Sequence, residues 1–226
     1  VREQTRAHRG GLEGHIVERH HAGFLVQLTH RRVGDGLAPF DMAAMIPIFH
    51  GWIQQRRLEE LMMIDVADYS HVRNGPGVML ICHEGQLAMD EGDGRLGLAY
   101  ANKRLAAGSV SDRLLTALRR ALSAAQLLEA EVQMAGKVEF IGNELLIRID
   151  DRLHAPNTAE TFQLLEADLS QALAGVYNGQ SVELRQIENA KAAFAVMATT
   201  SVPIDVSTLL ARLEGRSCQR SEVRRQ

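Results

Sequence analysis

Residues 64–103, IDVADYSHVRNGPGVMLICHEGQLAMDEGDGRLGLAYANK, decide the fold class because apolar runs alternate there with turn-forming residues. Residues 61–66 and 78–82 predict β-strands with few polar interruptions, which favours central positions in a sheet. The link of about residues 69–76 is too short for a parallel crossover, which needs a dozen or more residues. The two strands are therefore expected to pair antiparallel. Residues 96–103 are expected to add another strand, with a helix as the alternative because the alanines and leucines there also suit one.

The rest of the chain continues this mixture of strands and helices. Short links between successive strands make them antiparallel neighbours, and amphipathic helices are then expected to cover one face of the sheet. The predicted fold class is α+β, with a mainly antiparallel sheet and helices packed on one face in a two-layer sandwich. Further strands are predicted at residues 24–29, 138–141, 144–149, 181–187 and 194–199, with a tight hairpin at Gly142-Asn143. Helices are predicted within residues 41–55, 109–136, 157–178 and 205–213, with Gly136 ending the second and Gly215 the last. The predicted helix starts are a capping box of Ser109 with Asp112, a cap of Asn157 with Glu160, and a cap at Asp205.

Composition divides the 226 residues into three parts. Residues 1–21 are rich in arginine and histidine and predict a flexible arm, residues 22–214 predict a single α+β domain, and residues 215–226 predict a basic flexible tail. The formal net charge of -3 provides no basic field, so nucleic acid is not an expected partner.

Neither a membrane span nor a secretory signal is predicted. No apolar run reaches the roughly 18 residues that a membrane span needs, so no membrane partner is expected. The first residues contain no apolar signal-peptide segment, and Cys82 and Cys218 do not form a disulfide framework. These features predict a soluble, cytoplasmic protein.

Gly92, Gly94 and Gly97 match the G-x-G-x-x-G pattern of dinucleotide-binding turns. That chemistry needs a strand before the glycines and a helix after them, because the helix N-terminus holds the phosphates. Here the residues after Gly97 favour a strand. The pattern therefore predicts a hairpin turn, and no nucleotide cofactor is expected.

Carboxylates and imidazoles of this segment are suitable metal ligands, but strand register separates them. In an antiparallel pair Asp68 lies at the turn end and His83 lies opposite Met62, about five residues of roughly 3.4 Å each away. What remains at the turn end is Asp68 with His71 as a candidate catalytic acid–base pair, and Tyr69 as a substrate contact. The alternative is a turn whose Asp side chain binds neighbouring amides.

His83 and Glu84 form a second candidate site, where the apolar strand of residues 78–82 ends. Pairing around the turn at residues 91–94 would bring Asn102 and Lys103 opposite them. The two residues are predicted substrate contacts. The alternative is that the strand simply reaches water at this point.

The segment of residues 148–157 joins a predicted strand to a helix N-terminus, where free amides and the helix dipole favour an anion. Its carboxylates are also suitable for a divalent metal, the one cofactor that the side chains suggest, although no complete motif requires a cofactor. The alternative is an ion-paired loop that holds the start of the helix. The predicted metal ligands are Asp150, Asp151 and His154, and the predicted substrate contacts are Arg148, Arg152 and Asn157.

The blocks IDVADYSHVRNGPGVMLICHEG and DDRLHAPNTAETF resemble segments of an uncharacterised family of bacterial proteins, over most of the chain. The resemblance implies a bacterial, cytoplasmic protein and brings no activity, cofactor or site residue. The residues themselves leave two function hypotheses. The first is a non-catalytic binding or interaction module for a small molecule or a second copy of the chain. The alternative is a hydrolase-type enzyme, with or without a divalent metal, in which Asp68 and His71 meet residues 150–154.

Overall fold

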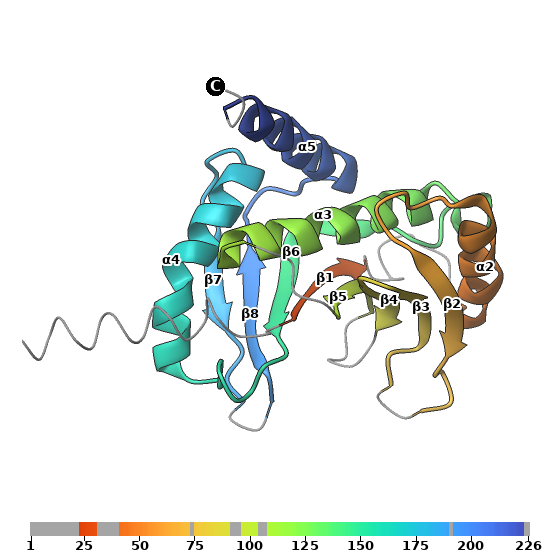
Figure 1. Ribbon diagram of the computed structural model, residues 1–226, viewed down its shortest axis with the longest axis horizontal. Helices are drawn as coiled ribbons and strands as arrows, with labels where there is room; N and C mark the ends of the chain where they lie inside the picture. Colours follow the sequence, from red (N-terminus) through yellow and green to blue (C-terminus); the bar gives the residue numbers. More distant parts are fainter. Residues whose placement is uncertain are drawn as a thin grey trace, which may run out of the picture.

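The computed structural model describes residues 23–30, 41–72, 75–90, 96–103, 108–189 and 192–223; for residues 30 and 216–223 it describes the backbone alone. The predicted arm of residues 1–21 lies outside these ranges. The elements, with the labels of Figure 1, are β1 (Phe24–His30), the 3-10 helix η2 (Met42–Ala44), α2 (Met45–Gln55), β2 (Met63–Asp68), β3 (Val78–Cys82), β4 (Gly85–Asp90), β5 (Gly97–Asn102), α3 (Val110–Glu129), the 3-10 helix η3 (Val132–Met134), β6 (Phe140–Ile149), α4 (Ala159–Val176), β7 (Glu183–Gln186), β8 (Phe194–Thr199) and α5 (Val206–Val223).

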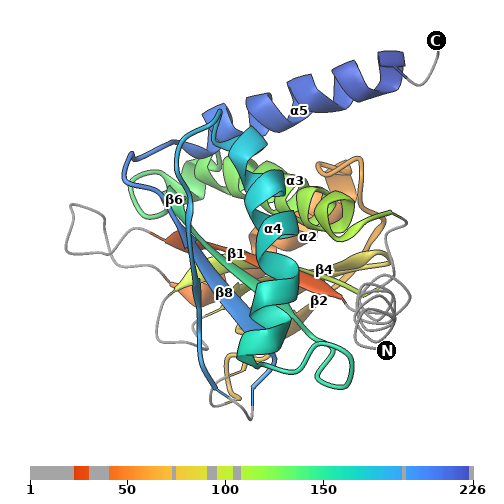
Figure 2. The ribbon, with the colours of Figure 1, turned by 90° about the vertical axis from the view of Figure 1, so that its left-hand side faces the viewer.

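The eight described strands form one sheet in the order β2-β3-β4-β5-β1-β6-β8-β7, and every neighbouring pair is antiparallel. In Figure 1, α3 lies over the middle strands, with α2 beside β2 and α4 beside β7. Figure 2 shows α3 and α5 stacked above the strands. The α+β class and the antiparallel sheet predicted from the sequence are confirmed. No helix in the described ranges is long and apolar enough to cross a membrane.

Helix α3 is the centre of the core, since it contacts β1, β5, α4 and α5. Ser109 starts it with the predicted capping box: its hydroxyl accepts the amide of Asp112, whose carboxylate accepts the Ser109 amide. The helix ends at Glu129, before the predicted stop at Gly136. Beyond it, Trp52 of α2 donates its ring N–H to Glu131 at 2.7 Å, which joins α2 to the end of α3.

The predicted central position of residues 61–66 is wrong, because β2 is an edge strand. The antiparallel pairing of β2 with β3 is confirmed. A strand that the sequence analysis did not separate, β4, follows β3 after a link of only His83 and Glu84. Strand β5 pairs antiparallel with β4, so a strand and not a helix follows the glycine pattern at Gly97; residues 92 and 94 lie outside the described ranges.

The predicted hairpin at Gly142-Asn143 is wrong, because β6 runs through both residues. Its register against β1 shifts between Leu28 and Thr29, so residues 142–144 form an irregular bulge. Gly142 donates its N–H to Ile204 at 3.1 Å and accepts the Tyr177 hydroxyl at 2.6 Å. A Cβ at this position would collide with the Ile204 carbonyl oxygen. The glycine is therefore needed for close backbone approach rather than for a turn.

Two helix ends also differ from the sequence prediction. Thr158, not Asn157, is the N-cap of α4, where its hydroxyl accepts the amide of Thr161. Asp205 caps α5 as predicted, accepting the amide of Thr208 at 2.8 Å. Helix α5 nevertheless continues past Gly215 to Val223, since an isolated glycine weakens a helix by only about 1 kcal/mol.

We expect Gly142→Ala to lower the free energy of unfolding by about 1–3 kcal/mol, because the added methyl group has no room beside Ile204. The matched control is Gly51→Ala, where the nearest atom to a new Cβ is 3.9 Å away in the interior of α2. That change should instead stabilise by about 0.5–1 kcal/mol. Urea unfolding measures both, and equal effects would contradict the close-approach explanation.

Candidate functional site

The β2–β3 pair places its polar residues at two separate ends. Tyr69 donates its N–H to Gly77 at one end, at 2.8 Å, and His83 donates its N–H to Met62 at the other, at 2.9 Å. The register that separates Asp68 from His83 is thus the one expected from the sequence. These residues do not form one metal site.

At the turn end, the Asp68 carboxylate is held by its own loop. Its Oδ1 accepts the backbone N–H of Ser70 at 2.9 Å and the Ser70 hydroxyl at 2.6 Å. These two bonds, with the charge of His71, lower the pKa of Asp68. His71 stacks on the exposed Tyr69, with ring centroids 6.5 Å apart. No hydrogen bond joins Asp68 to His71 in the part of the chain that the structure describes, so the arrangement favours the capped turn.

The end of β6 and the loop after it contain two polar pairs. Arg148 Nε donates to Asp150 at 2.7 Å, and His154 Nδ1 lies 2.9 Å from Asp151 Oδ2. Asp151 also accepts the amides of residues 153 and 154. Desolvation alone would raise the pKa of Asp151, but these donors outweigh it and the pKa is lowered. Arg152 is exposed.

The three predicted metal ligands are therefore divided between two pairs: Asp150 bonds to Arg148, while Asp151 bonds to His154. Across the described ranges, no three His, Cys, Asp or Glu side chains are close enough together to hold a metal ion. The arrangement favours the ion-paired loop over a metal site.

Asn157, a predicted substrate contact, is buried and fully engaged. Its side-chain NH₂ lies 2.9–3.3 Å from the carbonyl oxygens of Ile187, Asn189 and Ala193, and its oxygen accepts the Gln186 amide at 2.7 Å. The residue thus ties the loop before α4 to the β7–β8 link.

The loops of residues 68–71 and 150–154 leave the sheet at opposite strand ends. Following the pairing across the sheet, Asp68 shares its end with Gly97 and Ile141, whereas Ile149 lies with Phe24 at the other end. Four strands lie between β2 and β6, which corresponds to roughly 24 Å between their axes. The two loops do not share a pocket.

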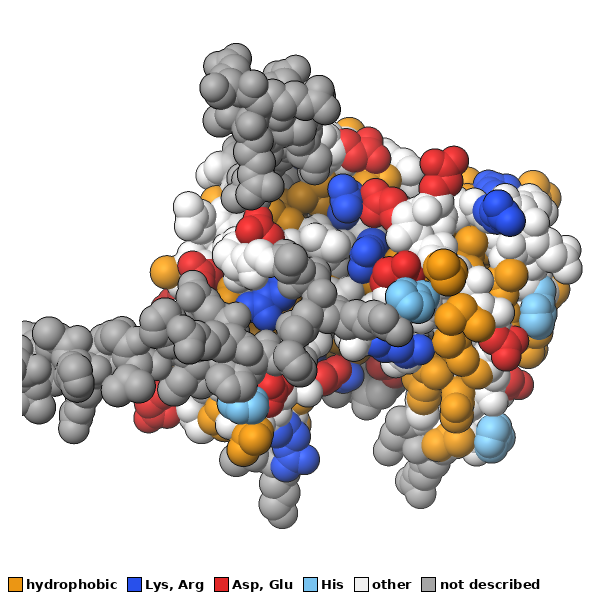
Figure 3. Space-filling view, viewed as in Figure 1, with side chains coloured by type: hydrophobic (Ala, Val, Ile, Leu, Met, Phe, Trp, Pro, Cys, Tyr) orange, Lys and Arg blue, Asp and Glu red, His pale blue; other side chains and the backbone are white. Residues whose placement is uncertain are grey.

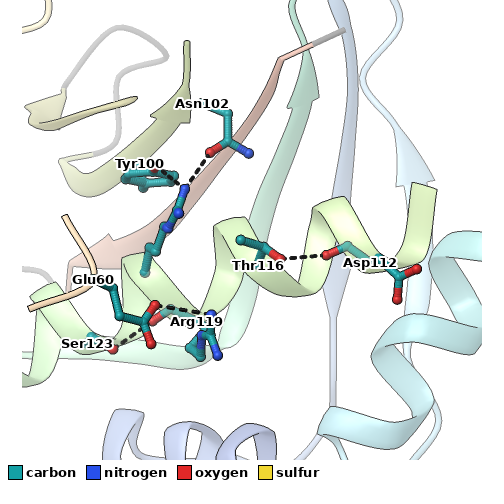
Figure 4. A network of polar contacts seen from close by, with 8 residues as sticks. Glu60, Tyr100, Asn102, Asp112, Thr116, Arg119 and Ser123 are labelled. Atoms are coloured by element: carbon teal, nitrogen blue, oxygen red, sulfur yellow. Dashed lines mark hydrogen bonds and ion pairs between the residues drawn. The ribbon is translucent and has the colours of Figure 1, made fainter. Parts of the chain in front are cut away.

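A different group of side chains does converge, at the His83–Glu84 end of the sheet. Arg120 of α3 donates from Nη1 to the Tyr100 hydroxyl at 2.7 Å and to Asn102 Oδ1 at 3.2 Å (Figure 4). Its guanidinium also lies 5.5 Å from the centre of the Tyr100 ring. Lys103 donates its backbone N–H to Glu84 at 3.0 Å, as expected from pairing across the hairpin. We call Glu84, Tyr100, Asn102 and Arg120 the strand-end cluster.

Burial and hydrogen bonds fix the charges of the strand-end cluster. Desolvation raises the pKa of Tyr100 to about 12, although Arg120 opposes this, and it raises the pKa of the neighbouring Cys82 to about 12. Desolvation acts to raise the pKa of Glu84 as well. Its own backbone N–H, the Met62 N–H and the charges of His83 and Arg120 outweigh this, so the pKa of Glu84 is lowered. At neutral pH the cluster therefore contains a neutral phenol and a carboxylate, and the neighbouring Cys82 thiol is neutral.

The local sequence explains how Arg120 reaches the sheet. Gly85 starts β4 directly beside Tyr100, and a Cβ there would lie 2.6 Å from the tyrosine oxygen. Glycine thus makes room for the hydroxyl that Arg120 binds. On α3 the preceding arginine points elsewhere: Arg119 pairs with Glu60 at 3.1 Å (Figure 4).

A cavity of about 430 Å³ adjoins Arg120, between α3, α5 and the loop after α2. This volume is within the usual range of small-molecule sites. The Arg120 Nε is buried and has no hydrogen-bond partner among the described residues. The apolar lining is Leu58, Leu61, Leu127, Leu210 and Ala130, and the remaining lining is Arg57, Glu59, Glu60, Arg120, Ser123, Gln126 and Glu214.

The sequence analysis identified half of this site. It placed His83 and Glu84 opposite Asn102 and Lys103, because hairpin register can be read from the turn. It missed Tyr100 and Arg120. One signal was present, a single large hydroxyl-bearing residue within the small apolar run of residues 96–101, which indicates a buried hydrogen bond.

No model of a known protein family matches the chain, and no match is found among curated proteins.

We expect Asn157→Ala to lower the free energy of unfolding by about 2–4 kcal/mol, because three partly buried carbonyl groups lose the NH₂ group that lies within hydrogen-bond distance of them. The neighbouring Thr158→Ala removes only the cap of α4 and should cost about 1 kcal/mol. Chemical denaturation compares the two variants. A wild-type midpoint for Asn157→Ala would contradict the structural role and favour the predicted substrate contact.

Proposed function

We propose that the protein is a non-catalytic binding module that holds a small amphipathic carboxylate in the cavity beside Arg120. The observation that carries the proposal is an arginine, fixed by two hydrogen bonds, at the wall of a leucine-lined cavity. A bacterial, cytoplasmic setting belongs to the same proposal, from the resemblance and the cysteine usage of the sequence.

The position of Arg120 supports a carboxylate as the bound group. Tyr100 and Asn102 use one nitrogen of the guanidinium, while Nε has no partner within the part of the chain that the structure describes. A guanidinium presents a planar fork of donors that matches a carboxylate. Because Tyr100 is buried and neutral, its hydroxyl orients the arginine without cancelling its charge.

The other charges of the cavity restrict the ligand to a single anionic group. Glu60 is paired with Arg119, Arg57 adds one positive charge to the lining, and Glu59 and Glu214 are exposed there. These carboxylates repel a highly charged molecule such as a polyphosphate. The leucines provide apolar contact, so a monocarboxylate with a short apolar chain fits best.

The electrostatics of the strand-end cluster favour binding over catalysis. A nucleophile or a general base needs a pKa near neutral pH. The pKa values of Cys82 and Tyr100, each raised to about 12, keep both groups protonated. The hydrolase alternative depended on Asp68 and His71 meeting residues 150–154, and the strand order removes its support.

We expect octanoate to bind with a Kd on the order of 0.1–1 mM, with 1-octanol and octylamine binding more weakly. Arg120→Met should weaken octanoate about tenfold and leave 1-octanol unchanged, because only the charged hydrogen bond is lost. An NMR titration of the three probes measures these affinities. Equal affinity for octanoate and octylamine would contradict the proposal.

A second variant pair separates loss of the site from loss of the fold. Gln126 lines the cavity, and Gln171 is an exposed glutamine on α4 outside that lining. Gln126→Phe should fill the cavity and weaken octanoate at least fivefold, whereas Gln171→Phe should bind as the wild type does. Octanoate binding that survives Gln126→Phe contradicts this location.

A further inference from the structure

Edge strand β2 presents an apolar surface to solvent. Four of the eight large exposed hydrophobic side chains of the described residues lie within residues 62–72. They are Met62, Ile64, Tyr69 and Val72, exposed by 63%, 57%, 40% and 44%, and we call them the β2 surface. Figure 3 shows hydrophobic side chains gathered in a stripe over β2 and β3. Exposed apolar side chains so concentrated are typical of docking sites.

A bulge in β2 assembles this surface. Met63 and Val66 both pack against the main core, which regular alternation does not allow at a spacing of three residues. The register shift between Met63 and Asp65 inserts Ile64 as an extra residue and resolves the conflict. The same shift places Met62 and Ile64 on the side of Tyr69, away from the core. Without it, these side chains would lie on opposite faces.

The free edge of β2 is covered by a carboxylate. Tyr69 donates its N–H inward to Gly77, so the N–H of Val66, three residues earlier, points to the open edge. Asp65 accepts that N–H with Oδ1 at 2.8 Å. A partner strand can pair with β2 only after Asp65 turns away, and a lysine or arginine on the partner would draw it away.

We infer that the β2 surface docks an extended segment of another protein in which basic residues alternate with apolar ones. The apolar residues would cover Ile64 and its neighbours, while the basic ones would pair with the exposed carboxylate of Asp65, which lies at the edge of β2. A second copy of the chain fits poorly, because symmetric pairing of two β2 edges brings the carboxylates of both copies into one short seam. The inference is independent of the cavity beside Arg120.

The test uses two fluorescent heptapeptides, one of alternating lysine and valine and one of alternating glutamate and valine. We expect the full-length chain to bind the basic peptide at least tenfold more tightly in fluorescence anisotropy. Ile64→Asn should weaken it about tenfold, and Asp65→Ala about threefold. Leu164→Asn, at a residue of α4 that is 47% exposed, is the matched control and should leave it unchanged.

Each other outcome overturns the inference. Equal binding of both peptides, or of neither, excludes a basic strand as the occupant. Binding that Ile64→Asn and Leu164→Asn weaken alike places the contact elsewhere. Sedimentation velocity covers the remaining case, because a dimer that Ile64→Asn dissociates would make a second copy the occupant. Circular dichroism of each variant checks that the fold is retained.

Discussion

The packing of α3 on the sheet is the constraint on which the rest of the structure depends. This helix contacts β1, β5, α4 and α5, and most of its leucines and all of its alanines are completely buried. A helix with so wide an apolar face leaves little room for charge, yet its sequence contains adjacent arginines. Their side chains diverge by about 100° around the helix axis, so Arg119 reaches Glu60 while Arg120 reaches Tyr100. The charged part of the cavity thus follows from how α3 is docked.

The pattern of neighbouring residues was sufficient to predict an element whose bounds depend on its own residues alone. Strand β3 has the bounds expected from its apolar run, and the capping box of α3 was visible as Ser109 and Asp112. Local pattern failed where the partner of a residue lies far away in the chain. Gly142 resembles a turn residue, but the carbonyl of Ile204 explains it. The apolar run that became β2 resembles a central strand, although strand order leaves it at the edge.

The candidate site also has one part that could be predicted from neighbouring residues and one part that could not. Hairpin register brought Glu84 opposite Lys103, because both belong to one continuous stretch of antiparallel pairing. Arg120 reaches Tyr100 and Asn102 because of the rotation of α3 about its axis over the sheet. That rotation cannot be predicted from any short segment of the sequence. The order of the strands in the sheet also explains why the loops of residues 68–71 and 150–154 do not form one site. Strand β1, far earlier in the chain, is inserted between β5 and β6, and its insertion contributes to separating residues 68–71 from residues 150–154.

The hydrogen bond between Trp52 and Glu131 has a practical consequence. The chain contains one tryptophan, and its ring is buried where α2 meets the segment after α3. Its fluorescence emission therefore reports on a single junction of the molecule, near β2 and far along the sheet from β7. A loss of structure that starts at the β7–β8 end would leave the emission spectrum unchanged until the core around α3 opens. Tryptophan emission and far-ultraviolet circular dichroism together would reveal whether the two ends of the sheet unfold in one step.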